Sequence, residues 1–286
     1  MMRTRFAPSP TGRLHLGHVL AAKEAFGFGP PEDSTCLLRI EDIDHTRCKH
    51  AFTLGIFEDL NWLGFDWPIP VRLQSRHYTD YAKVIASLLE RGLAYPCGLT
   101  RAELKAGQEP DSQASLSVSE FLTHFTADDL TPLPAPSLPY AIRLNISKAT
   151  DSISERSLTF IETGQDKDYG RNVDAAASLI DWAKSNRPDP IIARKDIGVS
   201  YHIAVTHDDH HQGISHIVRG MDLFEETPLH ILIQQLMGWT TPIYHHHPLL
   251  RREDGEKLSK RGLDTSIESL RENSLTAAQV LAMAYP

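Results

Sequence analysis

The chain has 286 residues, a length that predicts about two domains and a hydrophobic core large enough to form without disulfide bonds. Its formal net charge of −8 at pH 7 gives no global signal for nucleic-acid binding, although a local basic patch would be enough to bind RNA. The cysteines Cys36, Cys48 and Cys97 are too scattered for a disulfide framework or a metal knuckle. Because we find no apolar run typical of a signal peptide or a membrane span, we expect a cytoplasmic protein.

The first ninety residues alternate between strand and helix patterns. The apolar spacing predicts strands over 5–7 and 35–40, and helices over 17–26, 46–63 and 78–89. A turn from Pro8 to Gly12 follows the first strand, and the acidic turn Glu41-Asp42-Ile43-Asp44 follows the second. This alternation is typical of a parallel α/β half-domain.

The remainder of the chain is less regular. Residues 105–139 are polar and proline-rich around one short predicted helix near 119–125, and strands are predicted over 141–146 and 157–162. This pattern indicates a smaller inserted unit with long loops. Apolar runs return at 189–205, and Thr227 is predicted to cap a helix that ends at Gly238. After a basic loop, two short helices are predicted near Thr265 and Ser274.

Two short motifs nearly 240 residues apart carry the chemistry. One is HLGH, His15 to His18, where the helix begins; the other is KLSKR, Lys257 to Arg261, in a glycine-flanked loop. Each motif alone is weak evidence for a function; a lysine pair in a loop, for example, is usually part of the solvated surface. A helix start beyond a strand end favours the binding of an anion, above all a phosphate.

Together the two motifs resemble the signatures of class I aminoacyl-tRNA synthetases. RFAPSPTGRLHLGH, LLRIEDIDHTR and the segment from YHIAVTHDDHH to LMGW are similar to the glutamyl branch of that class, and the resemblance spans most of residues 3–100 and 188–262. It implies that glutamate is bound by Arg5, Ala7, Ser9, Glu41, Tyr201 and Arg219. It also implies an ATP site at Pro8, Gly17, His18 and Lys260, with His15, His18, Lys257 and Lys260 as catalytic residues. A bidentate Arg–carboxylate pair would distinguish glutamate from glutamine.

Departures from that branch favour one truncated family within it. The chain ends 25 residues after Arg261, and Val205 and Met221 replace the Asn and Glu that are usual there. These features resemble the glutamyl-queuosine tRNA(Asp) synthetases, which activate L-glutamate with ATP and esterify it to queuosine in the anticodon of tRNA(Asp). The alternatives are a short glutamyl-tRNA synthetase that charges an acceptor end, and a non-catalytic synthetase relic that binds RNA or senses an amino acid. We expect a monomer that binds the tRNA anticodon arm and no membrane.

The metal content is also expected to depart from that family. Many of its members bind zinc through a Cys-x-Cys motif, but here Leu99 stands two residues after Cys97 and no cysteine follows. One thiolate cannot make a tetrahedral site, so we predict no zinc, and magnesium carried by the ATP phosphates. The histidine-rich runs 207–216 and 245–247 are expected to have ordinary turn and surface roles, the first as a strand and turn near the active site.

The expected fold class is α/β. It is a Rossmann-like class I synthetase catalytic domain with a smaller inserted α+β unit and a short helical C-terminal segment. The predicted division places the first catalytic half at 1–96, the insert at 97–187, the second catalytic half at 188–240 and the lysine loop with the helical segment at 241–286. Basic residues gather late in the chain and could meet an RNA backbone: Arg251, Arg252, Lys257, Lys260, Arg261 and Arg271.

Overall fold

We describe the fold from a computed structural model, which covers residues 1–107, 114–125, 136–153, 158–164, 170–185, 187–250 and 266–284. The first third alternates as expected: β1 (Met2–Phe6), α1 (Leu16–Phe26), β2 (Ser34–Ile40), α2 (His50–Trp62), β3 (Arg72–Leu73), a 3-10 turn (Gln74–Arg76) and α3 (Tyr78–Glu90). Strands β1, β2 and β3 pair in parallel, which confirms the predicted parallel α/β arrangement. No helix within the described ranges is long and apolar enough to cross a membrane.

The middle of the chain forms short elements. They are β4 (Ala94–Cys97), α4 (Arg101–Lys105), α5 (Val118–Thr123), β5 (Ala141–Leu144), α6 (Ile146–Asp151), β6 (Thr159–Glu162), β7 (Arg171–Asp174) and α7 (Ala175–Lys184). The strand predicted over 141–146 ends at Leu144, because the Asn145 side chain caps α6 by accepting from the Lys148 backbone N–H. Strand β6 pairs in parallel with a later strand at 243–247, since Glu162 lies opposite Tyr244.

The last third returns to alternation: β8 (Ile191–Ala193), α8 (Tyr201–His211), β9 (His216–Gly220), a 3-10 turn (Met221–Glu226), α9 (Thr227–Leu236) and β10 (Ile243–His247). The two short predicted helices are α10 (Ile267–Glu272) and α11 (Ala277–Met283). Two helix starts differ from the sequence prediction. Helix α2 begins at His50 rather than Thr46, because the Thr46 hydroxyl donates to the Asp44 carboxylate in a turn. Thr227 is the first residue of α9 rather than its cap, because its hydroxyl accepts a hydrogen bond from Arg219.

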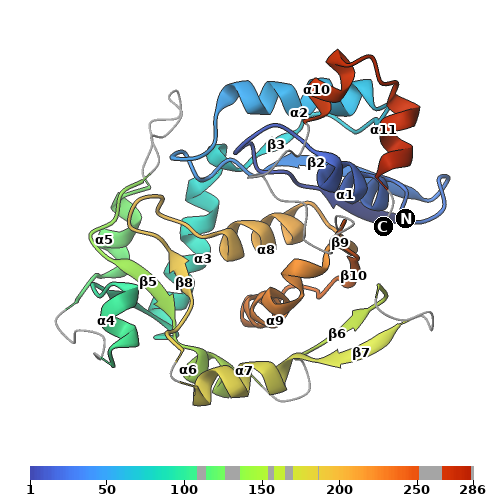
Figure 1. Cartoon of the computed structure of the whole chain (residues 1–286). Coiled ribbons are helices and arrows are strands. Elements are labelled where there is room, and N and C mark those ends of the chain that lie inside the picture. The colour runs from blue at the N-terminus through green and yellow to red at the C-terminus, as the bar shows by residue number, and fades with distance from the viewer. Residues whose placement is uncertain are drawn as a thin grey trace.

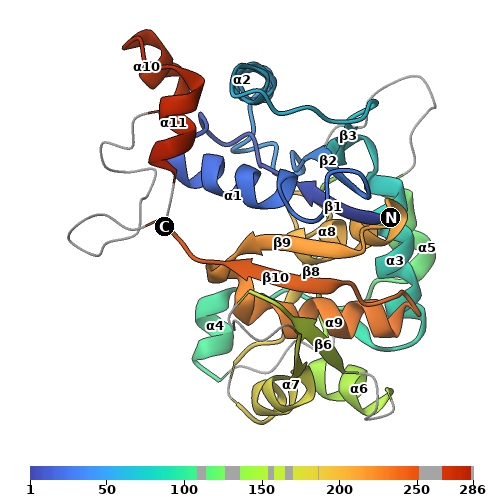
Figure 2. The ribbon, with the colours of Figure 1, turned by 90° about the vertical axis from the view of Figure 1, so that its right-hand side faces the viewer.

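Two sheets meet edge to edge at the centre of the molecule. The hydrogen-bonded orders are β1-β2-β3 and β7-β6-β10-β9, and β9 lies beside β1 (Figures 1 and 2). Contacts from Arg3 to Ser215 and from Arg5 to Val218 show that β1 and β9 run in the same direction. The spatial order β3-β2-β1-β9-β10 is therefore that of a Rossmann-like fold, and the order in which successive strands are added to the sheet reverses between β1 and β9.

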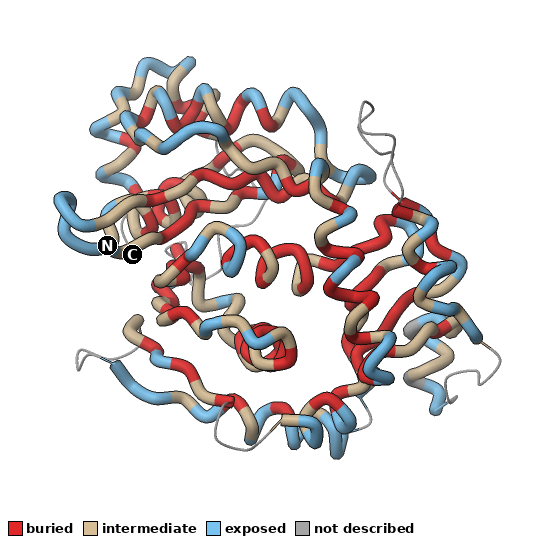
Figure 3. The backbone as a smooth tube through the Cα atoms, turned by 180° about the vertical axis from the view of Figure 1, so that it is seen from behind, coloured by how far each residue is buried: buried red, intermediate tan, exposed pale blue. Residues whose placement is uncertain are grey.

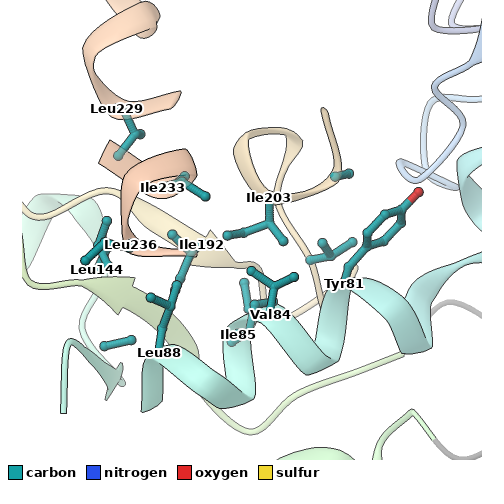
Figure 4. Packing of buried hydrophobic residues seen from close by; sticks show 14 of the residues in the cluster. Tyr81, Val84, Ile85, Leu88, Leu144, Ile192, Ile203, Leu229, Ile233 and Leu236 are labelled. Atoms are coloured by element: carbon teal, nitrogen blue, oxygen red, sulfur yellow. The ribbon is translucent and has the colours of Figure 1, made fainter. Parts of the chain in front are cut away.

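Side chains of these strands alternate between two hydrophobic clusters. In β9, Val218 packs with residues of α1, α2, α10 and α11, whereas Ile217 packs with residues of α3, α8 and α9. Figure 4 shows the second cluster, in which Tyr81, Val84, Ile85 and Leu88 of α3 meet residues of β5, β8, α8 and α9. Buried residues follow the central strands and inner helices, and exposed residues the outer helix faces (Figure 3).

Candidate functional site

A cavity of about 590 Å³ opens beyond the carboxyl ends of β1, β2 and β9. Ligands of open α/β folds bind at this edge, next to the point where the strand order reverses. The lining contains most of the residues predicted for a site: Arg5, Ala7, Pro8, Ser9, His18, Glu41, Tyr201 and Arg219. The loop after β1 is fixed in this position because Pro8 accepts a hydrogen bond from the Glu41 backbone and Pro10 accepts one from the Lys49 backbone.

The HLGH motif forms the N-terminus of α1. The His15 side chain caps the helix by accepting from the Gly17 N–H through Nδ1, and His18 Nδ1 accepts in turn from the His15 N–H. The two rings lie 3.9 Å apart between centroids. A Cβ on Gly17 would lie 3.0 Å from the His15 ring, so glycine lets the ring fold back over the helix start. His18 lines the cavity, whereas His15 and Gly17 lie outside its lining.

Buried charges stand directly behind the cavity. The Arg39 side chain is fully buried and donates to Asp209 at 2.8 Å and to Glu41 at 3.2 Å. Arg5 donates to the same Asp209 oxygen at 3.0 Å and to the Val218 carbonyl at 3.0 Å, which bridges β1 and β9. Burial raises the pKa of Glu41, although Arg39 and Arg5 oppose the effect. Arg39 and Arg5 thus favour the charged form of Glu41 against the effect of burial.

Asp208 extends this network toward α3. Its carboxylate accepts from Arg72 at 2.8 Å, from Gln74 at 3.1 Å and from the Tyr81 hydroxyl at 2.9 Å. Burial would raise the pKa of Asp208, but the hydrogen bond from His207 and the nearby Arg39 and Arg72 lower it to about 2. The network thus pairs three arginines with three carboxylates, and its charges balance inside the protein.

Arg219 differs from the other arginines of the site. Its guanidinium donates to His246, His230, Thr227 and the Leu223 carbonyl, at distances from 2.7 to 3.1 Å. Among the described residues no carboxylate lies within ion-pair distance of it, although its side chain is only 6% exposed and lines the cavity. A buried cation without a paired carboxylate favours an anionic group in the cavity.

The number of N–H groups left over on each arginine shows which of them can make the expected bidentate contact with a carboxylate. A guanidinium has five N–H groups, and the four hydrogen bonds of Arg219 leave one of them. Arg5 makes two hydrogen bonds within the described chain and keeps three N–H groups. A bidentate grip on a carboxylate is therefore available to Arg5, while Arg219 supplies charge and a single donor. Beside them, burial raises the pKa of Tyr201, which keeps its phenol neutral.

The prediction for the histidine-rich runs is wrong in two respects. Residues 201–211 form helix α8, so the strand begins only at His216, and Asp208 and Asp209 are buried rather than on a surface turn. Residues 245–247 lie within strand β10, where His246 and His247 are buried. Arg39, which precedes the acidic turn, and His230 in α9 were not among the predicted site residues. Hydrophobic periodicity gives no sign of a buried charged or polar side chain whose partners come from distant segments.

The lysine motif falls outside the described residues, as do Arg251, Arg252, Lys257, Lys260 and Arg261. Its place beside the HLGH helix remains a prediction, and so do the roles of the individual site residues. Arg271, the basic residue of that group within the described ranges, lies on α10 near Trp62. Cys97 is buried in β4, and no group of three or more His, Cys, Asp or Glu residues within the described ranges could hold a metal ion.

The family of the chain follows from comparison with known proteins. The family model described as tRNA synthetases class I (E and Q), catalytic domain, matches residues 1–283. The chain belongs to this family. As a class I tRNA synthetase it is a ligase, and its Rossmann-like strand order is the fold expected for the class.

Relatives of this synthetase fall into two groups. It is 36% identical to a glutamyl-Q tRNA(Asp) synthetase of Rhodobacter capsulatus over 98% of both chains. It is 34% identical to glutamate–tRNA ligase 2 of Paracoccus denitrificans over 90% of this chain and 51% of that protein, so it spans about half the length of the ligase. A crystal structure of a glutamate tRNA ligase from Elizabethkingia meningosepticum matches with a TM-score of 0.64 and 27% identity, over 91% of this chain and 52% of that chain.

A more distant structure shares the fold alone. The methionyl-tRNA synthetase of Mycobacterium tuberculosis, bound by methionyl-adenylate, matches with a TM-score of 0.60 at 11% identity. The likeness covers 99% of this chain and 63% of that chain. The class I catalytic fold is therefore present across the described elements, whichever amino acid a member activates.

Proposed function

We propose that the chain activates L-glutamate with ATP and transfers the glutamyl group to queuosine in the anticodon wobble position of tRNA(Asp). The observation that carries the first half is one cavity that holds both signs of charge: Arg219, which has no paired carboxylate among the described residues, and Glu41. An amino acid with an extra carboxylate matches this set, since Glu41 offers a partner for its ammonium group and Arg5 and Arg219 offer donors for carboxylates.

In the proposed reaction, a carboxylate oxygen of glutamate attacks the α-phosphorus of ATP, and the bond to the bridging oxygen breaks to release pyrophosphate with its Mg²⁺. A hydroxyl of the cyclopentene-diol then attacks the carbonyl carbon and loses its proton to solvent, and AMP leaves with the electron pair of the broken C–O bond. His15 and His18 at the start of α1, together with Lys257 and Lys260, are proposed to stabilise charge on the phosphate oxygens. ATP and tRNA are the expected substrates of a cytoplasmic enzyme.

The preference for queuosine is supported by the comparison rather than by the cavity. The relative that aligns over 98% of both chains is named a glutamyl-Q tRNA(Asp) synthetase. The second candidate is a glutamyl-tRNA synthetase that charges an acceptor end, because the glutamate–tRNA ligases match this chain at 31–34% identity. Both candidates share the first half-reaction and differ in the RNA that accepts glutamate.

Two assays test the proposal in order. ATP–pyrophosphate exchange driven by L-glutamate, with L-glutamine as the matched control and no tRNA, tests activation. Transfer of labelled glutamate to tRNA(Asp) with and without queuosine then tests the acceptor. Exchange with glutamate and transfer only to the queuosine-containing tRNA would support the full proposal. Transfer to the acceptor end of an unmodified tRNA would select the second candidate, and no exchange with or without tRNA would contradict both.

The same exchange assay tests Lys260. Removal of one donor that stabilises transition-state charge lowers turnover by about a hundredfold or more, so Lys260→Ala should do the same. Lys83→Ala, on the exposed side of α3, is the control for a lost lysine. Near-normal exchange by Lys260→Ala would remove this residue from the proposed machinery.

A further inference from the structure

A ring of polar side chains holds Arg219 from the side away from the cavity. His246 of β10 is its direct cross-strand neighbour, and the Arg219 Nε–H donates to His246 Nε2 at 3.1 Å. On the other side of the guanidinium, Nη1 donates to His230 Nδ1 at 3.1 Å. Both histidines are at least 99% buried, and Tyr244 lies under the guanidinium with 5.2 Å between the ring centroid and Cζ.

The geometry assigns a tautomer to each histidine. An arginine can only donate, so the ring nitrogen that faces it must be unprotonated. His246 then carries its proton on Nδ1, which lies 2.5 Å from Glu162 Oε2. His230 carries its proton on Nε2, which lies 3.1 Å from His202 Nδ1, and His202 Nε2 faces Glu226 at 3.8 Å. Each imidazole is thus a neutral acceptor toward Arg219.

Glu162 is itself immobilised, which fixes the His246 ring. Its Oε1 accepts from the backbone N–H of Gly164 at 2.7 Å and of His246 at 3.0 Å. A Cβ on Gly164 would lie 2.2 Å from the His246 carbonyl oxygen, so this close approach requires glycine. Burial would raise the pKa of Glu162, but the hydrogen bonds from His246 lower it overall, which keeps the carboxylate charged.

We propose that His246 and His230 are positioning residues that orient the Arg219 guanidinium by presenting two unprotonated imidazole nitrogens to it, and that they thereby set the affinity of the site for a carboxylate substrate. This inference rests on the proposed function only in naming glutamate as that substrate. The four donors fixed by the protein leave one N–H of Arg219, so its direction depends on the two histidines. Neither histidine lines the cavity or touches the reacting atoms.

The arrangement makes substrate affinity depend on pH. A proton on His246 Nε2 or on His230 Nδ1 would place N–H against N–H and positive charge against Arg219. The charged or titratable groups that face His246 are Glu162, Arg219, Tyr244 and His245. Those that face His230 are Arg219, His202, Tyr201, Arg5 and His246. Burial lowers the pKa of both histidines from the ordinary 6.5, and Arg219 adds to this effect. Both rings are therefore neutral near pH 7. The KM for glutamate should rise only when the pH falls through the lowered pKa values of these rings, which lie below 6.5.

The first experiment uses the free protein and needs no substrate. Ring ¹⁵N chemical shifts of the histidines, assigned with His230→Asn and His246→Gln, report which nitrogen is protonated near neutral pH. We expect His246 as the Nδ1–H tautomer and His230 as the Nε2–H tautomer. The opposite tautomer for His246, or an imidazolium at neutral pH, would overturn the inference whatever the protein catalyses.

The second experiment tests whether His246 acts as a hydrogen-bond acceptor for Arg219 or only fills space. In His246→Gln the amide oxygen can replace Nε2, whereas His246→Leu fills the space without an acceptor. We expect the KM for glutamate to rise by about tenfold or more in the Leu variant and by less than about threefold in the Gln variant, with kcat little changed in both. The Gln variant should also weaken the rise of KM at acid pH, because its amide does not titrate.

His245→Gln is the matched control, since this neighbour on β10 contacts Thr163 instead of Arg219. Its KM should stay at the wild-type value. If wild-type protein exchanges but the Leu and Gln variants have the same KM and the same pH profile, the positioning role is refuted while the proposed function stands. If wild-type protein shows no exchange with or without tRNA, the proposed function fails, and the tautomers measured in the free protein decide the inference.

Discussion

Replacement of Arg39 by methionine tests whether the buried charges behind the cavity hold the site together. Arg39 is fully buried and touches Asp209 at 2.8 Å, Glu41 at 3.2 Å and Gln212 at 3.1 Å. Methionine fills a similar volume without charge or donors. The variant would change a balanced set of three arginines and three carboxylates into two arginines against three carboxylates, so one negative charge would remain unpaired inside the protein.

The expected cost follows from this imbalance. Removal of one partner from a buried ion pair destabilises proteins by about 3–5 kcal/mol, because the other charge stays desolvated. Asp209 would still accept from Arg5, so we expect the lower end of that range, about 3 kcal/mol. Glu41 would also lose its main opposing charge, so its pKa should rise further and the contact proposed for it with an ammonium group should weaken.

Urea unfolding followed by tryptophan fluorescence measures the stability change, and Arg91→Met is the control. Arg91 is the exposed C-cap of α3, and within the described ranges its side chain makes one hydrogen bond, to the Leu236 carbonyl. Its replacement should therefore cost less than about 1 kcal/mol. A cost for Arg39→Met no greater than that of the control would refute the reasoning. It would mean that the carboxylates are already solvated or protonated in the native protein.

Three further predictions concern other described residues. Burial raises the pKa of Asp59 from 3.8 to about 6, so the folded protein binds this proton more tightly than the unfolded chain and its stability falls as the pH rises from 4 to 6. The gain in unfolding free energy of Asp59→Asn over wild type should therefore be on the order of 2 kcal/mol larger at neutral pH than at pH 4, and an equal gain at both pH values would contradict the assignment. The pKa of Asp208 is lowered to about 2, so this group stabilises the fold above pH 4 and the stabilisation is lost as the pH falls toward 2. The unfolding free energy of wild type should fall by on the order of 2 kcal/mol over this pH range because of Asp208, and that part of the fall should be absent in Asp208→Asn. Gly17→Ala should push the His15 ring away from the start of α1 and slow ATP–pyrophosphate exchange by about tenfold, and unchanged exchange would show that the ring position is irrelevant.

The sequence was a good guide where local chemistry decides structure. The parallel strands, the helix after HLGH and the stops at Gly64 and Gly92 were predictable, because glycine tolerates the positive φ of 85° and 66° found there. The resemblance also named eight of the residues that line the cavity. Most of these positions lie within or just after β1, β2 and β9, and strands of a parallel sheet end at the same edge.

The remainder depends on contacts that no local pattern encodes. Asp208 and Asp209 look like surface residues in a histidine-rich run, and they are buried only because Arg39, Arg5 and Arg72 arrive from distant strands. The sequence gives equally little sign of the role of His246, because its partner Glu162 lies on β6, 84 residues earlier in the chain. Thr227 is a good helix cap by composition, but the demand of Arg219 for an acceptor overrides that preference.

The placement of β1 has a consequence for how the protein is made. This strand is complete within the first six residues, and one side of it pairs soon afterward with β2, yet the strand on its other side begins only at His216. A chain emerging from a ribosome must therefore keep that edge of β1 uncovered while some two hundred residues are added. Arg5 gains Asp209 and the Val218 carbonyl, and Arg219 gains His246, only near the end of this interval. The contacts proposed for Arg5 and Arg219 with substrate consequently become available only after almost all of the described elements have been synthesised.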